Sequence, residues 1–437
     1  MRVCVVGTGH VGLVTCASLA AVGHEVVGVD SDEAKIEQLK SGDSPFFEPG
    51  LPELVEEGLR SQRLRFSTQI ADGAPEAEIV FICVGTPPRE SGEANLVAVE
   101  NATREVMQHL SRAAVIVEKS TVPAGTSERI RRTLQRERPD LAPQVDVVSN
   151  PEFLREGKAV EDATNPDRIL IGADGERAFV PMRELYKPWI DRGVPVFETN
   201  IATAELAKHA CNAFLSTKIS FVNALARLCE RAGADVVAVA DVMGADDRIG
   251  RQFLNAGLGY GGYCFPKDLL AFERLASRLG YEFGLLREVA TINDDAVRAA
   301  VEKVKDALWN MEDKRIAVLG LAFKPDTDDI RLSPSLALAR QLLDEGAHVV
   351  GYDPVAGLEA KGEIPDLEVV NTMWEACEGA HCVVIATDWQ EFKDADLERL
   401  RSTMAYPVVV DGRNIYEPAE MNRLGFTYYP TGRPVVS

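Results

Sequence analysis

The residues best suited to covalent chemistry lie together in the segment GYGGYCFPKD, at positions 259–268. Cys264 offers a nucleophilic thiol, and Lys267 and Asp268 follow it with opposite charges. The run PKDLLAFERLASRLG predicts a helix with Pro266 in its first turn and a glycine at its end. Because the positive end of a helix lowers the pKa of a nearby thiol, Cys264 is a candidate nucleophile. The alternative is an inert buried thiol like the other seven cysteines, and the glycine run favours the first interpretation.

A second group of residues, GTGHVG at positions 7–12, has the spacing of a dinucleotide-binding loop. Glycines in this pattern let a pyrophosphate approach the backbone at a helix N-terminus. Asp30, which ends the next apolar strand, can accept hydrogen bonds from ribose hydroxyls and favours NAD over NADP. Lys35 leaves NADP open as the less favoured cofactor. The predicted cofactor contacts here are Gly7, Gly9, His10, Val11, Gly12, Asp30 and Lys35.

Three polar segments follow further apolar strands: VGTPP at 84–88, KSTVP at 119–123 and SNPEFLREG, which ends at Gly157. The carboxyl ends of parallel strands line the ligand crevice of such a sheet. These loops are therefore candidate ligand contacts, although each can also be an ordinary turn.

The segment from Ile201 to Ala232 contains no glycine or proline, and its apolar residues recur at helical spacing. We predict one long helix that joins two domains or two subunits. Glu205, Lys208 and Asn212 share one face of this helix. Without further context, this face is best interpreted as a polar surface stripe.

The elements that must position these residues alternate strand and helix through the first 200 residues, which predicts a parallel sheet covered on both faces. The segment 314–353 repeats the organisation of residues 1–31, but a longer loop, AFKPDTDDIRLSP, replaces the glycine motif. We therefore predict an α/β chain with two Rossmann-like doubly wound parallel-sheet domains, a long central helix and a helical middle region. The expected parts are 1–200, which binds NAD, 201–309, which carries the cysteine loop, and 310–437, which binds a different ligand.

The composition excludes several classes of function. A formal net charge of −21 argues against a nucleic-acid partner, because phosphate contacts need a basic face. No apolar stretch approaches the roughly 18 residues of a membrane span, and glycines interrupt the apolar N-terminus too often for a signal peptide. Eight scattered cysteines suit a reducing cytoplasm. Cys377, His381 and Cys382 lack a second pair of ligands, so we expect no metal.

The motifs together resemble those of the nucleotide-sugar 6-dehydrogenases of the UDP-glucose/GDP-mannose dehydrogenase family. The resemblance covers essentially the whole chain, through GTGHVGLV, KSTVPAGTS, SNPEFLREG, GYGGYCFPKD, GLAFKPDTDDIRLSP and DGRN. It implies oxidation of a sugar C6 alcohol to a carboxylate with two NAD+ and no metal. The implied substrate is UDP-glucose, because the cysteine and FKPDTDD segments are closer to enzymes that act on that sugar. Cys264 would hold the aldehyde as a thiohemiacetal, which is then oxidised to a thioester and hydrolysed.

The resemblance also implies catalytic roles. Lys208 would stabilise an oxyanion, Asp268 would transfer protons, and Asn212 would orient both groups. Thr121 and Glu152 would position or activate water, with Glu152 as the base for thioester hydrolysis. The glycines before the cysteine would leave room for the sugar to lie against the backbone.

The remaining implied contacts concern binding. For NAD they are Thr86, Thr121, Glu156, Lys267 and Arg331. For the substrate they are Glu152, Phe153, Leu154, Glu156, Lys208, Asn212, Arg248, Asn255, Tyr260, Gly261, Phe323, Lys324 and Arg413. Arg248, Lys324 and Arg413 would supply the positive charge that a diphosphate needs in an acidic protein. Because Arg248 matches an arginine that reaches a neighbouring subunit's site, we expect a homodimer or a higher homo-oligomer.

Three alternatives remain open at this point. A sibling enzyme that oxidises GDP-mannose or a UDP-N-acetylhexosamine would share the cysteine chemistry. A regulatory protein that senses NAD(H) would need the glycine loop but not Cys264, Lys208 and Asp268 together. A two-electron dehydrogenase of the 2-hydroxyacid type would form one NADH per substrate instead of two.

Overall fold

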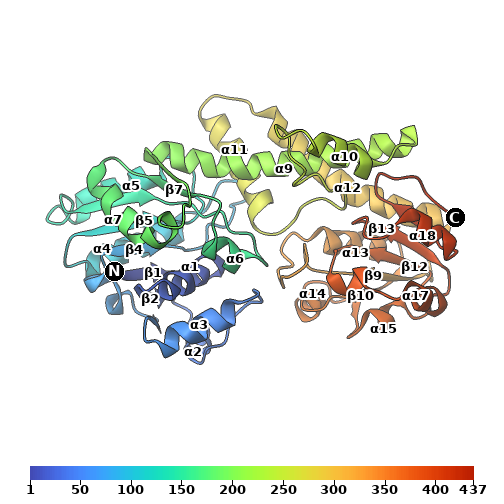
Figure 1. Ribbon diagram of the computed structural model, residues 1–437, viewed down its shortest axis with the longest axis horizontal. Helices are drawn as coiled ribbons and strands as arrows, with labels where there is room; N and C mark the ends of the chain where they lie inside the picture. The colour runs from blue at the N-terminus through green and yellow to red at the C-terminus, as the bar shows by residue number, and fades with distance from the viewer. The chain divides into compact units, whose positions relative to one another are not determined.

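A computed structural model describes residues 1–437, which form two compact units. Unit 1 comprises Met1–Cys211 and Leu270–Leu279, and unit 2 comprises Asn212–Leu269 and Gly280–Ser437. Two helices therefore contribute residues to both units, namely α9 (Ile201–Ala232) and α11 (Cys264–Arg278). The bounds of α9 confirm the predicted long helix, which Figure 1 shows without interruption.

Unit 1 is built on an eight-stranded sheet with the order β3-β2-β1-β4-β5-β6-β7-β8. Its strands are β1 (Arg2–Val6), β2 (Glu25–Val29), β3 (Leu64–Ser67), β4 (Ile79–Ile82), β5 (Ala114–Glu118), β6 (Val145–Ser149), β7 (Ile169–Gly172) and β8 (Val196–Thr199). The first six run parallel, whereas β7 pairs antiparallel with β6. The strands predicted before Asp30 and before the three polar segments are confirmed as β2, β4, β5 and β6, and β3, β7 and β8 were not predicted.

Helices cover both faces of this sheet, as predicted (Figure 1). Alternate side chains of β1 enter two separate cores: Val3 and Val5 pack in the core with α1 and α3, whereas Cys4 and Val6 pack in the core with α4 and α5. The helical elements are α1 (His10–Ala21), α2 (Glu33–Lys40), α3 (Leu51–Arg60), α4 (Val97–His109), α5 (Thr126–Glu137), α6 (Ala159–Thr164), α7 (Glu176–Leu185), α8 (Lys187–Ile190) and the 3₁₀ turns Ile70–Asp72 and Ala74–Glu76.

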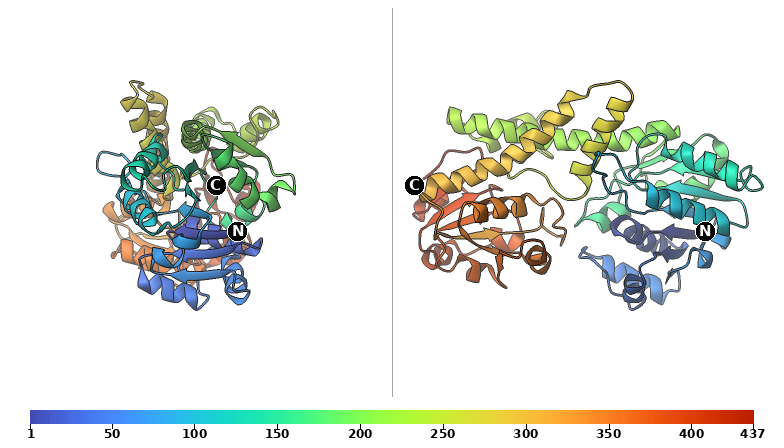
Figure 2. Two further views of the ribbon diagram at one scale, coloured as in Figure 1. Left: turned by 90° about the vertical axis from the view of Figure 1, so that its left-hand side faces the viewer. Right: turned by 180° about the vertical axis from the view of Figure 1, so that it is seen from behind.

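Unit 2 contains a second sheet, coloured orange to red in Figure 2. It is fully parallel and has the order β11-β10-β9-β12-β13-β14. Its strands are β9 (Arg315–Leu319), β10 (His348–Tyr352), β11 (Glu368–Val369), β12 (Cys382–Ile385), β13 (Val408–Asp411) and β14 (Thr427–Pro430). Its further helices are α10 (Val236–Gly244), α12 (Gly284–Leu308), α13 (Pro334–Asp344), α14 (Gly357–Glu363), α15 (Met373–Cys377), α16 (Gln390–Lys393), α17 (Leu397–Thr403) and α18 (Pro418–Arg423). None of the helices in either unit combines the length and apolarity needed to cross a membrane.

The predicted internal repeat is confirmed at the level of single hydrogen bonds. Gly7 and Gly320 directly follow β1 and β9, and both have a φ of +94°. Each donates its amide proton to the residue that ends the neighbouring strand, Val29 or Tyr352, at 2.7 Å in both cases. The two sheets also share their strand order over six strands, so each half of the chain begins with the same structural unit.

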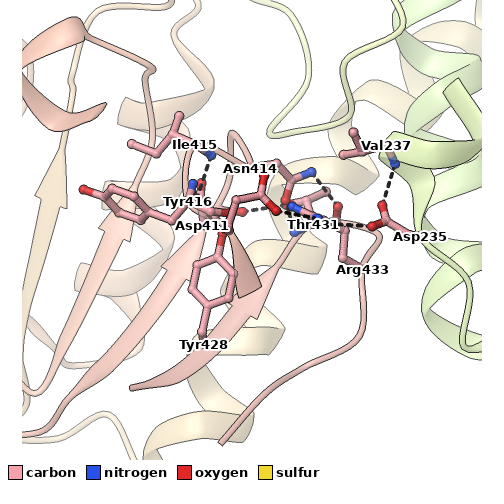
Figure 3. Close-up of polar contacts among 10 residues, drawn as sticks. Asp235, Val237, Asp411, Asn414, Ile415, Tyr416, Tyr428, Thr431 and Arg433 are labelled. Atoms are coloured by element: carbon pink, nitrogen blue, oxygen red, sulfur yellow. Dashed lines mark hydrogen bonds and ion pairs between the residues drawn. The ribbon is translucent and has the colours of Figure 1, made fainter. Parts of the chain in front are cut away.

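The buried side chain of Asp411, the last residue of β13, organises the loop that follows this strand (Figure 3). Asp411 Oδ2 accepts hydrogen bonds from the amides of Ile415 and Tyr416 and from the hydroxyl of Tyr428. Burial raises the pKa of Asp411, and these hydrogen bonds oppose the rise. Asp411 Oδ1 accepts from the amide of Arg413, so the network fixes the loop that carries this predicted substrate contact.

Candidate active site

The three glycines of loop 7–12 differ in what surrounds their Cα atoms. A Cβ at Gly7 would lie 2.6 Å from the carbonyl oxygen of Cys83, and a Cβ at Gly12 would lie 1.8 Å from that of Gly7. Beside Gly9, in contrast, the space is open to at least 4 Å, and α1 begins there without a side-chain cap. The backbone at this helix start therefore fits a pyrophosphate, as NAD would require.

Asp30 connects this loop to the second strand. Its Oδ2 accepts hydrogen bonds from the amide and hydroxyl of Thr8, at 2.9 and 3.0 Å, and lies 3.0 Å from Lys35 Nζ. Burial alone would raise the pKa of Asp30, but the hydrogen bonds from Thr8, Lys35 and Asp32 outweigh it and lower the pKa. Asp30 is thus an ionised acceptor beside the glycine loop, as a ribose contact requires. Lys35 was the residue that left NADP possible as the cofactor, and its ammonium forms an ion pair with this same carboxylate.

The other predicted cofactor contacts of unit 1 lie at the carboxyl edge of its sheet. His10 begins α1, followed by Val11, and its ring stacks on Phe46 with centroids 3.8 Å apart. Thr86 is buried, and its Oγ1 donates to the carbonyl oxygen of Thr121 at 3.0 Å. This bond links the loops that follow β4 and β5, so the two predicted threonines are held together.

The predicted base Glu152 and the predicted oxyanion group Lys208 form a buried ion pair. Their Oε1 and Nζ atoms are 3.0 Å apart, and both side chains are about nine-tenths or more buried. Lys208 Nζ also lies 5.3 Å from the ring centroid of Phe153, so this cation, the base and a predicted substrate contact meet in one place. Since Glu205 and Asn212 are buried as well, the interpretation of this face of α9 as a surface stripe is wrong.

Two buried glutamates anchor this region: Glu48, which the sequence analysis did not single out, and Glu205, which it interpreted as part of a surface stripe. Glu48 accepts hydrogen bonds from the amides of Gly157 and Ala159, both at 2.7 Å, and so fixes the end of the loop that begins at Glu152. Glu205 accepts from the amides of Gly125 and Ser127 at the start of α5. Both contacts join residues about 80 to 110 positions apart, and no local pattern predicts them.

Cys264 is the first residue of α11, which confirms the predicted helix start. Cys264 therefore lies at the positive end of a helix, as the prediction of a reactive thiol requires. Within unit 2, the predicted proton-transfer residue Asp268 is buried one turn later and bound on both sides. Asn212 Nδ2 donates to its Oδ2, and Lys267 Nζ donates to its Oδ1, each at 2.6 Å. These two contacts hold the Asp268 carboxylate in place within unit 2, and its predicted role in proton transfer stays a prediction.

The other cysteines are poorly suited to nucleophilic chemistry. Burial raises the pKa of Cys4, Cys83, Cys377 and Cys382 to about 12, and it also raises the pKa of Cys16 and Cys229. Cys211 is half-buried, but it lies inside α9 instead of at a helix start. No group of three or more His, Cys, Asp or Glu side chains is arranged to hold a metal ion.

Glycine is required at two positions before Cys264 for a reason other than the predicted one. A Cβ at Gly261 would lie 2.4 Å from the carbonyl oxygen of Leu332, and a Cβ at Gly262 would lie 2.8 Å from the ring of Phe323. Protein atoms of the same unit, and not a sugar, therefore occupy the space that these glycines leave. The expectation that they make room for the sugar is wrong at these two positions.

Several predicted contacts gather around the same loop. Arg413 donates to the carbonyl oxygens of Gly259 and Phe323, at 3.5 and 3.4 Å. The guanidinium of Arg331 lies over the ring of Tyr263, which precedes Cys264, with 4.6 Å to the centroid. Lys324 Nζ lies 5.3 Å from the Phe323 ring centroid. These contacts place three cations within unit 2 near the Cys264 segment.

The remaining predicted contacts differ in exposure. Arg248 has a side chain that is 89% exposed and pairs with Asp246, so the structure does not gather it with the others. Asn255 is exposed and accepts a hydrogen bond from Arg251. Tyr260 is buried, and its backbone exchanges hydrogen bonds with Asn293. Leu154 and Glu156 are half-buried in the Glu48-anchored loop.

A buried carboxyl at the end of β5 makes stability depend on pH. Glu118 Oε1 accepts from the amide of Ser120, whereas its Oε2 is buried without a partner, and burial raises its pKa to about 8. The folded state therefore binds more protons than the unfolded state between pH 4.5 and 8, so this group's contribution to stability falls as pH rises across that window. Glu118→Gln is expected to reduce this fall by up to a few kcal/mol.

The measurement is the midpoint of urea unfolding at pH 5.5 and pH 8.5 for both proteins. A smaller difference between the two pH values in Glu118→Gln supports the assignment. An unchanged difference would show that the Glu118 pKa lies near its ordinary value. Glu128→Gln on the exposed part of α5 serves as the control, because it removes one carboxylate without removing a buried one.

Three parts of the chain match the three domain models of one known protein family. Residues 1–190 match the NAD binding domain, residues 202–295 the central domain and residues 317–418 the UDP binding domain of the UDP-glucose/GDP-mannose dehydrogenase family.

Individual proteins are similar to this chain over nearly its full length. The chain is 46% identical over 438 residues to a UDP-glucose 6-dehydrogenase of Rhizobium meliloti, covering 99% of this chain and 100% of the other. It is 43% identical over 437 residues to UDP-glucose 6-dehydrogenase YwqF of Bacillus subtilis, covering 100% and 98%. Among solved structures, a UDP-glucose dehydrogenase from Pyrobaculum islandicum matches with a TM-score of 0.91 and 38% identity, covering 99% and 98%.

Proposed function

Because the chain belongs to the UDP-glucose/GDP-mannose dehydrogenase family, we propose that it oxidises UDP-glucose to UDP-glucuronate through covalent intermediates on Cys264. It is an NAD-dependent nucleotide-sugar 6-dehydrogenase, and its full-length relatives support UDP-glucose as the substrate. The observation that carries the covalent part is the position of Cys264 at the first residue of α11. Asp268, buried one turn later, supplies a group for proton transfer.

The proposed sequence of steps assigns one task to each side chain. NAD+ supplies the hydride acceptor when it is bound, and two are used for each sugar. Asp268 accepts the proton of the C6 hydroxyl as the alcohol becomes an aldehyde. Cys264 Sγ then bonds to C6, and the Lys208 ammonium stabilises the charge on the oxygen. Loss of a hydride and a proton from this thiohemiacetal leaves a thioester.

Hydrolysis completes the reaction. Glu152 takes a proton from a water that Thr121 helps to position, and the resulting hydroxide attacks the thioester carbonyl. The carbon–sulfur bond breaks, which releases the carboxylate product and returns the Cys264 thiolate. The ion pair between Glu152 and Lys208 supports this assignment, because it holds the base beside the group that stabilises the oxyanion.

The binding residues are proposed in two groups. The open backbone at Gly9 and the ionised Asp30 support NAD at the first sheet. Arg413 and Lys324 support a diphosphate near the cysteine segment. We accordingly retain the division into 1–200 for NAD, 201–309 for the catalytic cysteine and subunit association, and 310–437 for the UDP sugar. Because the reaction needs a reduced thiol, we propose a reducing compartment, the cytoplasm, for this enzyme.

The yield of NADH per UDP-glucose tests the overall reaction. We expect two NADH for each UDP-glucose consumed, with UDP-glucuronate identified by mass spectrometry. One NADH per sugar would indicate a two-electron dehydrogenase and would contradict the proposal. A UDP-D-ManNAc dehydrogenase from Pyrococcus horikoshii matches with a TM-score of 0.87 and 29% identity, so UDP-N-acetylhexosamines and GDP-mannose belong in the same assay. Faster turnover of either would move the assignment to a sibling substrate.

The exposed face of α9 supports the proposed homodimer. Phe214, Phe221 and Leu228 are each more than half exposed and recur every seven residues, which places them on one side of the helix. Such an apolar stripe is typical of an interface between subunits. We expect Phe214→Arg/Phe221→Arg to convert the dimer to a monomer in size-exclusion chromatography with light scattering.

Leu358→Arg is the matched control for that experiment, because Leu358 is 87% exposed on α14 and lies outside the stripe. The dimer should survive this substitution. A wild-type protein that is already monomeric, or a double variant that stays dimeric, would exclude the stripe as the interface.

A further inference from the structure

Unit 1 contains a cavity of about 220 Å³ that none of the predicted site residues lines. It lies between the loop 87–96, the first turns of α4 and α5, and the second half of α11. Its charged lining residues are Arg89, Glu93, Glu100, Arg129, Arg274 and Arg278. Four guanidinium groups at one cavity are unusual for a chain whose net charge is −21.

The two glutamates of the cavity neutralise only one of these four arginines, Arg278. Glu93 is paired with Arg278, with 3.8 Å between Oε1 and Nη1. Glu100 accepts two hydrogen bonds from Arg104, which lies outside the cavity, at 2.9 and 3.1 Å.

The three remaining side chains, Arg89, Arg129 and Arg274, make no hydrogen bond or ion pair within the protein. Each is exposed, so no burial cost opposes its charge. Most other arginines of this acidic chain have an acidic partner, as Arg131 and Arg177 do. The cavity therefore holds three guanidinium groups whose charge no protein group balances.

The position of Arg89 is fixed by the loop that carries it. Its amide donates to the carbonyl oxygen of Glu93 at 2.8 Å, and its carbonyl oxygen accepts from Gly92 at 2.8 Å. Gly92 has a φ of +81°, and a Cβ there would lie 2.8 Å from the side chain of Leu270 in α11. The loop is thus folded back on itself and packed on the helix that carries Arg274.

We propose that this cavity binds a small anion with a diphosphate group. Guanidinium groups match phosphate oxygens in geometry and charge, and three of them suit two adjacent phosphoryl groups. The volume lies below the roughly 300 Å³ at which pockets for drug-sized ligands begin, which favours a diphosphate over a whole dinucleotide. The amides of Gly125 and Ser127 at the start of α5 already donate to Glu205, so the arginines carry the proposal. Since α11 begins at Cys264, an anion held by Arg274 would also fix the helix of the nucleophile.

Calorimetric titration of the full chain with inorganic pyrophosphate tests this site. The wild-type protein should show a binding event that Arg89→Ala/Arg274→Ala weakens by at least about tenfold, because each charge-assisted hydrogen bond contributes strongly. Arg132→Ala removes one exposed cation from the same helix α5 without touching the cavity and should bind like the wild type. Pyrophosphate that binds at the NAD or UDP sites is common to all three proteins, so their difference isolates the cavity.

Three results would overturn the proposal: no binding to the wild type, equal binding to the double variant, or equal weakening by Arg132→Ala. Circular dichroism and NADH formation from UDP-glucose establish that the double variant is folded, since none of its changes lies in the proposed catalytic residues. A parallel titration with monophosphate should give at least about tenfold weaker binding. Equal affinity for monophosphate would exclude a diphosphate as the preferred ligand.

Discussion

Cys264→Ser is expected to lower the formation of UDP-glucuronate by at least about a thousandfold, which is the scale on which loss of a covalent nucleophile acts. A serine hydroxyl at the start of α11 keeps the shape of the side chain but stays protonated near pH 7, so it does not trap the aldehyde. The affinity for NAD+, measured by calorimetry, should remain within about twofold of the wild type, because Gly9 and Asp30 are untouched. The combination of lost turnover and retained cofactor binding distinguishes a nucleophile from a structural thiol.

Cys211→Ser is the matched control for this substitution. Cys211 is the only other cysteine that is not buried, and its sulfur lies 3.7 Å from Arg168 instead of at a helix start. Its replacement should leave turnover within about twofold. If Cys264→Ser retained substantial four-electron turnover, the thiohemiacetal and thioester route would have to be abandoned. Free aldehyde in the product mixture of this variant would be consistent with a first oxidation that is no longer captured.

Lys208→Met is the second substitution with a large expected effect. Removal of a cation that stabilises an oxyanion lowers kcat by about 10² to 10³. The ion pair with Glu152 adds a complication, because both groups are buried and the substitution leaves the carboxylate without its partner. Breaking a buried pair on one side costs about 3 to 5 kcal/mol of stability. A loss of activity in this variant alone is therefore ambiguous.

The double variant Glu152→Gln/Lys208→Met resolves the ambiguity, since it removes both charges together. We expect it to regain most of the stability lost in Lys208→Met, as measured by urea unfolding, but to stay inactive. Arg231→Ala removes one exposed cation from the same helix α9 and should leave both properties unchanged. A kcat within about tenfold of wild type for the double variant would contradict the roles proposed for Lys208 and Glu152.

The features that could be predicted from the sequence are those with a local cause. The spacing of Gly7 and Gly12 has a local steric cause, because a Cβ at Gly12 would meet the carbonyl oxygen of Gly7, and the bounds of α9 follow from an apolar period without interruption. The start of α11 follows from Pro266 near the beginning of a helical pattern. In each case the residues that determine the structure are close neighbours in the chain, so the pattern is visible without tertiary contacts.

The features that were missed depend on residues far apart in the chain. Strands β7 and β8 have four residues each and pair at the edge of a large sheet, so no period distinguishes them. The anchor at Glu48 requires the fold to bring it to Gly157. The error about the glycine segment has the same origin, because only the tertiary structure places Phe323 and Leu332 in the space that the glycines leave.

The assignment of Leu270–Leu279 to unit 1 has a consequence for attempts to dissect the protein. A fragment that ends near Cys211 lacks the second half of α11, and with it Leu270, which packs on Gly92, and Phe272, which stacks on His209. Such a fragment would expose apolar surface that the intact chain covers, and it should aggregate on expression. Supplying residues 264–279 as a separate peptide should restore its solubility. No single cleavage point in this chain separates the two compact units, because unit 1 includes a segment that follows part of unit 2 in the sequence.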